Sequence, residues 1–142
     1  MAAAFARDNT GARSLFLTAP IHNQPILCLA GRPILLGYGA WLWTHGYKNF
    51  EQREADMKAI YAGSNNPIER LEHYGVDYIY ISWSEKTDLK ANVAYFEQNF
   101  RPVFRQGEIT IYDARSRPAT DAQISVPLKL NRSSVRDADA GR

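Results

Sequence analysis

Two histidines occupy segments that are expected to follow apolar runs, and histidine is the side chain best suited to acid–base chemistry near neutral pH. His22 precedes Asn23 in the segment 19–24, and His45 lies in the glycine-rich segment 37–47. The two imidazoles could act as a base, a ligand pair or hydrogen-bond donors. The simpler interpretation, which we favour, is that each imidazole holds a loop carbonyl and that Asn23 is a turn residue. Metal sites usually need three or more ligands, and because no third is evident, no metal is expected.

Trp41 and Trp43 lie two residues apart in the same glycine-rich segment. On an extended backbone these side chains point the same way. They would then present one flat aromatic surface, which suits the apolar face of a sugar ring or a lipid. The favoured alternative is a hydrophobic plug that covers the end of the sheet. Gly37 and Gly39 do not make a dinucleotide-binding fingerprint, because the third glycine is missing.

Arg53 lies in the first two turns of the helix expected after that segment, where it could point back at the loop and pair with an anion. The alternative is an ordinary helix face, on which Glu54 and Asp56 suit the positive end of the helix dipole. These two carboxylates are a weak signal of a glycosidase, because residues two apart on a helix do not face each other.

Apolar runs and capping residues predict strands that alternate with helices. Buried strands are expected at 14–18, 34–38 and 76–82. Helices are expected at 49–62, 66–74 and 88–100, while 25–31 suits a helix or a strand and 102–112 a hairpin that turns at Gly107. The alternation predicts an α/β fold with a layered, mostly parallel sheet, helices on both faces and a C-terminal β-hairpin.

The 142 residues suit one domain. We expect a flexible N-terminus over 1–12, a single α/β domain over 13–113 and a disordered tail over 114–142. Ligands of open α/β sheets bind outside the carboxyl ends of the strands. The segments 19–24 and 37–47 should therefore lie at the same edge of the sheet, and we call them the rim segments. This places the two histidines, Asn23 and the two tryptophans within reach of one another.

Charge and cysteine content argue against several classes of protein. Seventeen basic and fifteen acidic side chains give a net charge of +2, which argues against a dedicated nucleic-acid-binding protein. Cys28 is the only cysteine, so no internal disulfide or thiolate zinc cluster is expected, and its apolar neighbours predict a small buried side chain. No apolar run approaches the roughly 20 residues that cross a bilayer. No secretion signal is evident either, so a soluble chain is expected.

Several short motifs follow one another along residues 13–113. They are FLT (16–18), HNQP (22–25), LAGRPI (29–34), GY (37–38), WLWTHG (41–46), READ (53–56), IYAG (60–63), YGVDYI (74–79), FRPVF (100–104) and GEITIY (107–112). Their order resembles the C-terminal soluble domain of polytopic membrane glycosyltransferases of the GT-C type.

The resemblance implies a membrane-embedded enzyme that moves a sugar from a lipid-linked phosphate donor to an acceptor. In that family the soluble domain follows the last membrane helices on the non-cytoplasmic side, and the catalytic acidic residues lie in the membrane part, so no catalytic residue is assigned here. The expectation is a non-catalytic domain or fragment that needs no cofactor and has the membrane-embedded portion as its partner. Its rim loops would help to bind the lipid-phosphate-linked sugar or the acceptor, through His22, Asn23, Trp41, Trp43, His45 and Arg53.

Two alternatives belong to other classes. A free-standing small hydrolase would use His22 and His45 as acid and base. A protein-interaction module would use the aromatic segment 37–47 as its binding patch.

Overall fold

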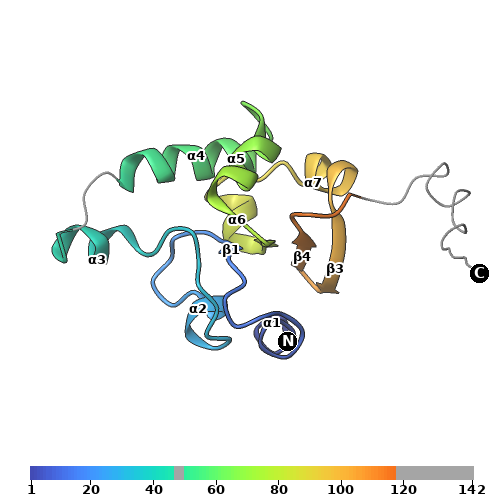
Figure 1. Cartoon of the computed structure of the whole chain (residues 1–142), viewed down its shortest axis with the longest axis horizontal. Helices are drawn as coiled ribbons and strands as arrows, with labels where there is room; N and C mark the ends of the chain where they lie inside the picture. The colour runs from blue at the N-terminus through green and yellow to red at the C-terminus, as the bar shows by residue number, and fades with distance from the viewer. Residues whose placement is uncertain (47–49, 118–142) are drawn as a thin grey trace, which may run out of the picture.

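The computed structural model describes residues 1–46 and 50–117. Within these residues seven helices accompany a four-stranded sheet, which confirms the predicted α/β class (Figure 1). The helices are α1 (Ala2–Asn9), α2 (Pro25–Cys28), α3 (Gly39–Thr44), α4 (Phe50–Ala62), α5 (Pro67–Tyr74), α6 (Trp83–Thr87) and α7 (Val93–Asn99). The strands are β1 (Phe16–Leu17), β2 (Tyr78–Ile81), β3 (Arg101–Gln106) and β4 (Ile109–Asp113).

The sheet has the order β1-β2-β4-β3 and is mostly antiparallel, so the prediction of a mostly parallel sheet is wrong. Among the described strands only β1 and β2 run parallel, with Phe16 opposite Tyr78. β4 is antiparallel to β2 and to β3, with Ile111 opposite Tyr80. The reason is the hairpin that turns at Gly107 (φ 59°). Its strands are antiparallel by construction and make up half of the sheet.

The expected strand at 34–38 is a single bridge rather than a strand, which corrects that prediction. Ile34 bridges Phe16 in parallel. The Phe16 amide donates to the Pro33 carbonyl at 3.0 Å, and the Leu35 amide donates to the Phe16 carbonyl at 2.9 Å. Pro33 has no amide proton to extend the ladder, and α3 begins at Gly39. The segment therefore runs beside β1 only briefly before it leaves the sheet.

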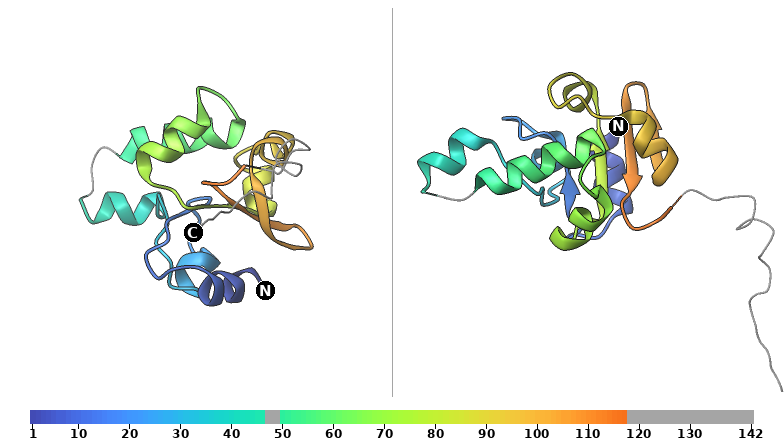
Figure 2. Two further views of the ribbon diagram at one scale, coloured as in Figure 1. Left: turned by 45° about the vertical axis from the view of Figure 1, so that its right-hand side comes forward. Right: turned by 90° about the horizontal axis from the view of Figure 1, so that it is seen from above.

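Residues of the sheet belong to two hydrophobic clusters, because successive residues of a strand point to opposite faces. Figures 1 and 2 show the helices around the sheet. Ile79 and Ile81 of β2 belong to the first cluster, and Tyr80 belongs to the second. In the first cluster they join Leu17, Met57, Ile60, Tyr61, Leu71, Phe96, Phe100 and Tyr112. In the second cluster Tyr80 joins Ala2, Ala3, Ala6, Phe16, Ile26, Ala30 and Ile111. Helices α4, α5 and α7 thus contribute to one cluster, and α1 and α2 to the other.

The N-terminus differs from the frayed segment expected over 1–12. Ala2–Asn9 forms α1, in which Ala6 is fully buried and Ala2 and Ala3 nearly so. Phe5 packs against Phe104 of β3, with ring centroids 5.0 Å apart. The small, polar composition suggested disorder, but three alanine methyl groups on one helix face fit closely over the sheet.

The predicted helices at 49–62 and 66–74 are confirmed as α4 and α5, and the ambiguous segment 25–31 contains the short helix α2. The expected cap Asn49 lies outside the described residues. The helix expected over 88–100 is wrong in its first half. Lys90 has φ 56°, a left-handed backbone conformation that an α-helix does not continue through, and it lies between α6 and α7. The Asn92 side chain then caps α7 by accepting a hydrogen bond from the Tyr95 amide at 3.1 Å.

Cys28 and the residues after β4 both differ from what their sequence suggests. Cys28 is exposed, not buried, because the last turn of α2 also leaves Leu27 and Leu29 in solvent. The expected tail at 114–142 begins with ordered residues. Ala114 is buried and its amide donates to the Asp77 carbonyl at 2.9 Å. The part of that tail from 118 to 142 lies outside the described residues.

Candidate functional site

The two predicted rim segments meet beside the carboxyl end of β1. Both follow stretches that run parallel to each other, since Ile34 bridges Phe16 in parallel. The His22 ring lies 5.5 Å from the ring of Tyr38, with an angle of 45° between the ring planes. His22 and Asn23 are both exposed. The contact between the segments thus involves Tyr38, an aromatic residue that the sequence analysis did not select.

The second rim segment is helical, and this overturns the extended backbone from which a shared tryptophan surface was predicted. Gly39–Thr44 forms α3, and residues two apart on a helix do not face the same way. Trp43 is 75% exposed, so it is not a buried plug. The Thr44 hydroxyl lies 3.4 Å from Nδ1 of His45, which is also exposed. The side chain of Trp41 lies outside what the structure describes.

Arg53 extends from α4 toward the chain before α3. Its Nη1 donates to the Leu35 carbonyl at 3.4 Å, and its guanidinium carbon lies 5.7 Å from the centre of the Tyr74 ring. These contacts join α4, α5 and the segment that follows the bridge to β1. Arg53 therefore has a structural role in addition to any role toward a ligand.

A buried carboxylate that the sequence analysis missed joins the ends of the two parallel strands. Glu85 is fully buried. Its Oε1 accepts from the Ala19 amide at 2.8 Å, and its Oε2 accepts from the Ser82 amide at 2.8 Å and from the Ser82 hydroxyl at 2.5 Å. The spacing Ser-x-x-Glu is a capping-box signal that could have located both residues. Because its oxygens are already occupied, Glu85 fixes the first rim segment rather than acting on a ligand.

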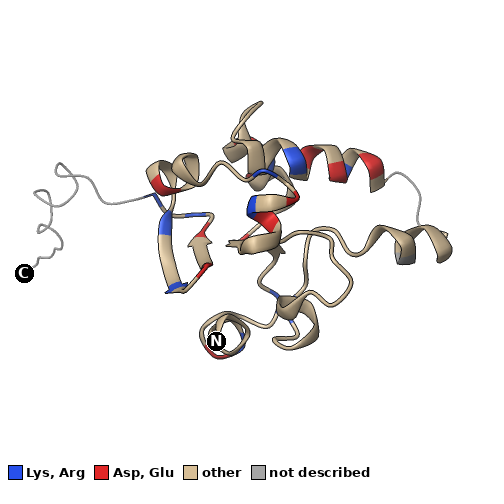
Figure 3. Ribbon diagram, turned by 180° about the vertical axis from the view of Figure 1, so that it is seen from behind, with Lys and Arg blue, Asp and Glu red and all other residues tan. Residues whose placement is uncertain are grey.

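The stretch from residue 14 to residue 46, which contains α2 and α3, combines exposed apolar side chains with a lack of charge. Between residues 14 and 46 the sequence contains one charged residue, Arg32. The Arg32 guanidinium donates to the carbonyls of Arg7, Thr10 and Ala30, so its charge is held by backbone carbonyls. The large apolar residues exposed here are Leu27, Leu29, Tyr38 and Trp43, which we call the uncharged surface. Figure 3 shows charged residues on α4 and α6 and none on α3.

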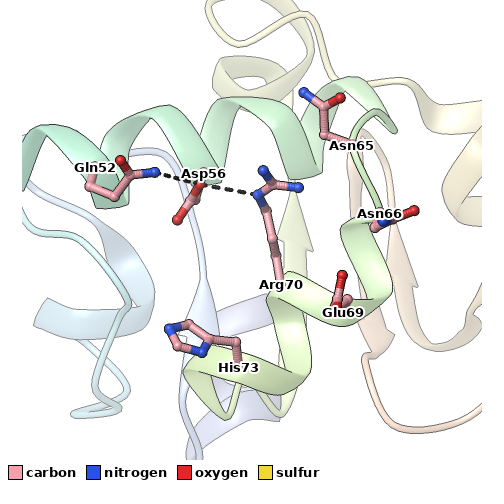
Figure 4. Close-up of a pocket in the computed structure, with 7 residues that line it drawn as sticks. All are labelled: Gln52, Asp56, Asn65, Asn66, Glu69, Arg70 and His73. Atoms are coloured by element: carbon pink, nitrogen blue, oxygen red, sulfur yellow. Dashed lines mark hydrogen bonds and ion pairs between the residues drawn. The ribbon is translucent and has the colours of Figure 1, made fainter.

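A polar hollow lies between α4 and α5, on a different part of the molecule (Figure 4). Its volume is about 570 Å³. The side chains that line it are Gln52, Asp56, Asn65, Asn66, Glu69, Arg70 and His73. The sequence analysis singled out Asp56 among these residues only as half of a weak carboxylate pair. The signal that could have found the hollow is the polar run Asn65-Asn66 between two helices whose facing residues are also polar.

Asp56 is the most constrained side chain of the polar hollow. Its Oδ1 accepts from Gln52 Nε2 at 3.0 Å and from Arg70 Nε at 3.1 Å, and its Oδ2 accepts from the Tyr74 hydroxyl at 2.5 Å. The hydrogen bond from Tyr74 does most to lower the pKa of Asp56, with a further contribution from Arg70. Burial and the Asp56 carboxylate raise the pKa of Tyr74. Asp56 is therefore ionised at neutral pH and held in one orientation.

Within residues 1–46 and 50–117, no three His, Cys, Asp or Glu side chains come together in a way that could hold a metal ion. None of the helices described is both long and apolar enough to span a bilayer. Comparison with models of known protein families and with curated proteins gives no match.

Proposed function

We propose that this chain is the extramembrane domain of a membrane glycosyltransferase of the GT-C type and that it docks through the uncharged surface. The proposal starts from the resemblance of residues 13–113 to that family. The observation that carries it further is the coincidence of exposed Leu27, Leu29, Tyr38 and Trp43 with a stretch whose single charge, on Arg32, is held by backbone carbonyls.

Exposed apolar side chains of this size mark contact surfaces when they gather on one face, and the proposal requires that these four do so. Interfaces are depleted of charge at their centres and enriched in aromatic side chains, because desolvating an unpaired charge costs more than desolvating a ring. Trp43, Tyr38 and the two leucines meet both conditions. A membrane-embedded enzyme offers apolar surface close to the bilayer, which suits such a partner.

The rim residues would contact the sugar or phosphate of the lipid-linked substrate in the assembled enzyme. In this proposal His22, Asn23, His45 and Arg53 supply polar contacts, and Trp41 and Trp43 supply apolar area. The layered arrangement, with helices on both faces, would hold the rim segments at one edge of the sheet. The domain would lie on the non-cytoplasmic side, and the catalytic acidic groups would come from the membrane portion.

The test is sugar transfer in membranes that contain the membrane-embedded partner together with this chain. A polyprenyl-phosphate sugar serves as donor. We expect the double variant Leu29→Ser/Trp43→Ser to lose transfer about tenfold or more, because it removes two large apolar contacts. Trp83→Ser is the matched control, since Trp83 is also largely exposed (63%) but lies on α6, outside the uncharged surface.

Normal transfer by a correctly folded Leu29→Ser/Trp43→Ser variant would reject the proposal. The interaction module would be favoured by two results together. The chain would co-purify with a partner only when the uncharged surface is intact, and sugar transfer would be the same with and without the chain. Hydrolysis of a substrate by the isolated chain, abolished by His22→Ala or His45→Ala, would favour the small hydrolase.

A further inference from the structure

We propose that the polar hollow between α4 and α5 is a binding site for a neutral saccharide. The hollow lies apart from the uncharged surface, so this proposal does not depend on the docking function. Its volume of about 570 Å³ falls within the range of small-molecule sites. The seven lining side chains are amides, carboxylates, a guanidinium and an imidazole, with no aliphatic side chain among them.

One part of the hollow is fixed before any ligand arrives. Asp56 is held by Gln52, Arg70 and Tyr74, and its side chain is only 13% exposed. Arg70 donates to Asp56 through its Nε, so the two Nη groups of its guanidinium remain available to a ligand (Figure 4). Because the Asp56 oxygens are occupied by these three bonds, Asp56 orients Arg70, and the Arg70 guanidinium presents its Nη donors at a set position.

The other part of the hollow offers polar groups without protein partners. Among the described residues, the two Nη groups of Arg70 donate no hydrogen bond, and the side chains of Asn65, Asn66 and Glu69 make none and no ion pair. Asn65 and Asn66 have φ of 56° and 58°. Two consecutive non-glycine residues in the left-handed region hold these side chains in a backbone conformation that is costly for residues other than glycine.

This set of groups matches vicinal hydroxyls better than other ligands. Each hydroxyl donates and accepts, and planar amides, carboxylates and guanidinium groups can serve two adjacent hydroxyls at once. The His73 ring, which meets Tyr74 edge-on with centroids 4.9 Å apart, adds a flat face for the C–H side of a sugar ring. A phosphate is disfavoured because Asp56 and Glu69 would repel it. An apolar ligand is disfavoured because every side chain that lines the hollow carries a polar or charged group.

The test is a two-dimensional NMR titration of the full chain with methyl α-glucoside, methyl α-mannoside, methyl β-galactoside and methyl N-acetylglucosaminide, each up to about 50 mM. Inorganic phosphate is titrated separately. We expect at least one glycoside to give saturable shifts of the side-chain amides of Gln52, Asn65 and Asn66. Glu69→Gln should weaken that binding about tenfold through the loss of a charged acceptor, and Glu72→Gln, on the same helix but outside the hollow, should leave it unchanged.

A second variant tests the same site if Glu69→Gln alters the fold. Asn66→Gly removes the amide and suits the left-handed backbone, so it should fold normally and also weaken binding. The proposal is overturned if no glycoside gives saturable shifts or if phosphate alone does so. It is also overturned if binding is insensitive to both Glu69→Gln and Asn66→Gly.

Discussion

Two buried polar side chains hold the short parallel pair of strands together. The Tyr61 hydroxyl lies 3.0 Å from the Leu17 carbonyl and 2.8 Å from the Tyr80 carbonyl, and burial raises its pKa well above the usual tyrosine value. Glu85 joins the Ala19 amide to the end of β2. Because β1 has only two residues, side chains supply cross-links that its own backbone ladder cannot.

Asp56 gives this protein a specific dependence of stability on pH. Its pKa is below the ordinary value of 3.8, chiefly because Tyr74 donates to it, so the folded state binds the proton less readily than the unfolded state. The stabilisation is therefore fully present above the ordinary pKa and is lost as the pH falls through the folded-state pKa. We expect Asp56→Asn to be less stable than the parent at pH 7, with the difference shrinking below about pH 4.

Urea unfolding at a series of pH values measures this difference. Asp8→Asn is the control, because Asp8 is 60% exposed and forms an ion pair with its neighbour Arg7. Profiles of the parent and of Asp56→Asn that stay parallel down to low pH would contradict the assigned role of Asp56.

At the scale of elements, the ends of helices decide how neighbouring helices pack. Both α4 and α5 end at a glycine with φ of 72°, Gly63 and Gly75, as expected for helix C-termini. A Cβ on Gly63 would lie 3.0 Å from Cγ of Tyr95, near the start of α7, whereas a Cβ on Gly75 would meet nothing within 4 Å. Gly63 thus serves both the backbone and the contact between α4 and α7.

This difference predicts unequal effects of the same substitution. Gly75→Ala should lower the free energy of unfolding by about 1–2 kcal/mol, which is the cost of a left-handed alanine. Gly63→Ala should lower it by about 1–3 kcal/mol more, because the added methyl group displaces Tyr95. Denaturant unfolding of both variants measures the effect. Equal losses would show that the close approach to Tyr95 is not a constraint.

At the scale of the whole molecule, each of the two hydrophobic clusters unites distant parts of the chain. The second cluster includes Ala6 near the N-terminus and Ile111 near the end of the described domain. Arg32 also joins distant segments, since it donates to carbonyls at Arg7 and Thr10. The N-terminal helix should therefore be part of the folded unit and not an appendage.

A carboxylate placed under α1 tests this arrangement. Ala6 is fully buried, so Ala6→Glu should detach α1 and remove the protection of its amides from hydrogen exchange. Asn9→Glu introduces the same group at an exposed position of the same helix and should have little effect. Hydrogen exchange followed by mass spectrometry reports on residues 2–9 directly. Equally low protection of residues 2–9 in the parent and in both variants would support the frayed N-terminus expected from composition, and strong protection in Ala6→Glu would contradict the burial of Ala6.

The sequence by itself determined those features whose signals are local. β2 was predicted from a run of β-branched and aromatic residues, and α5 from Asn66-Pro67 at its start and Gly75 at its end. The closing hairpin followed from Gly107 between two apolar runs. In each case neighbouring residues contain the information, because capping, turn formation and strand propensity act over a few residues.

Only the tertiary structure decided the features that depend on distant residues. β4 pairs with β2, which lies about thirty residues earlier in the chain. No local pattern specifies that β4, and not β3, is the hairpin strand that pairs with β2. Glu85 is buried where the distant Ala19 amide donates to it, and the polar hollow lies between α4 and α5, which contact each other. Burial and proximity are properties of the packed chain, so residue types and spacing could indicate candidates such as His22 and Trp43 but not their surroundings.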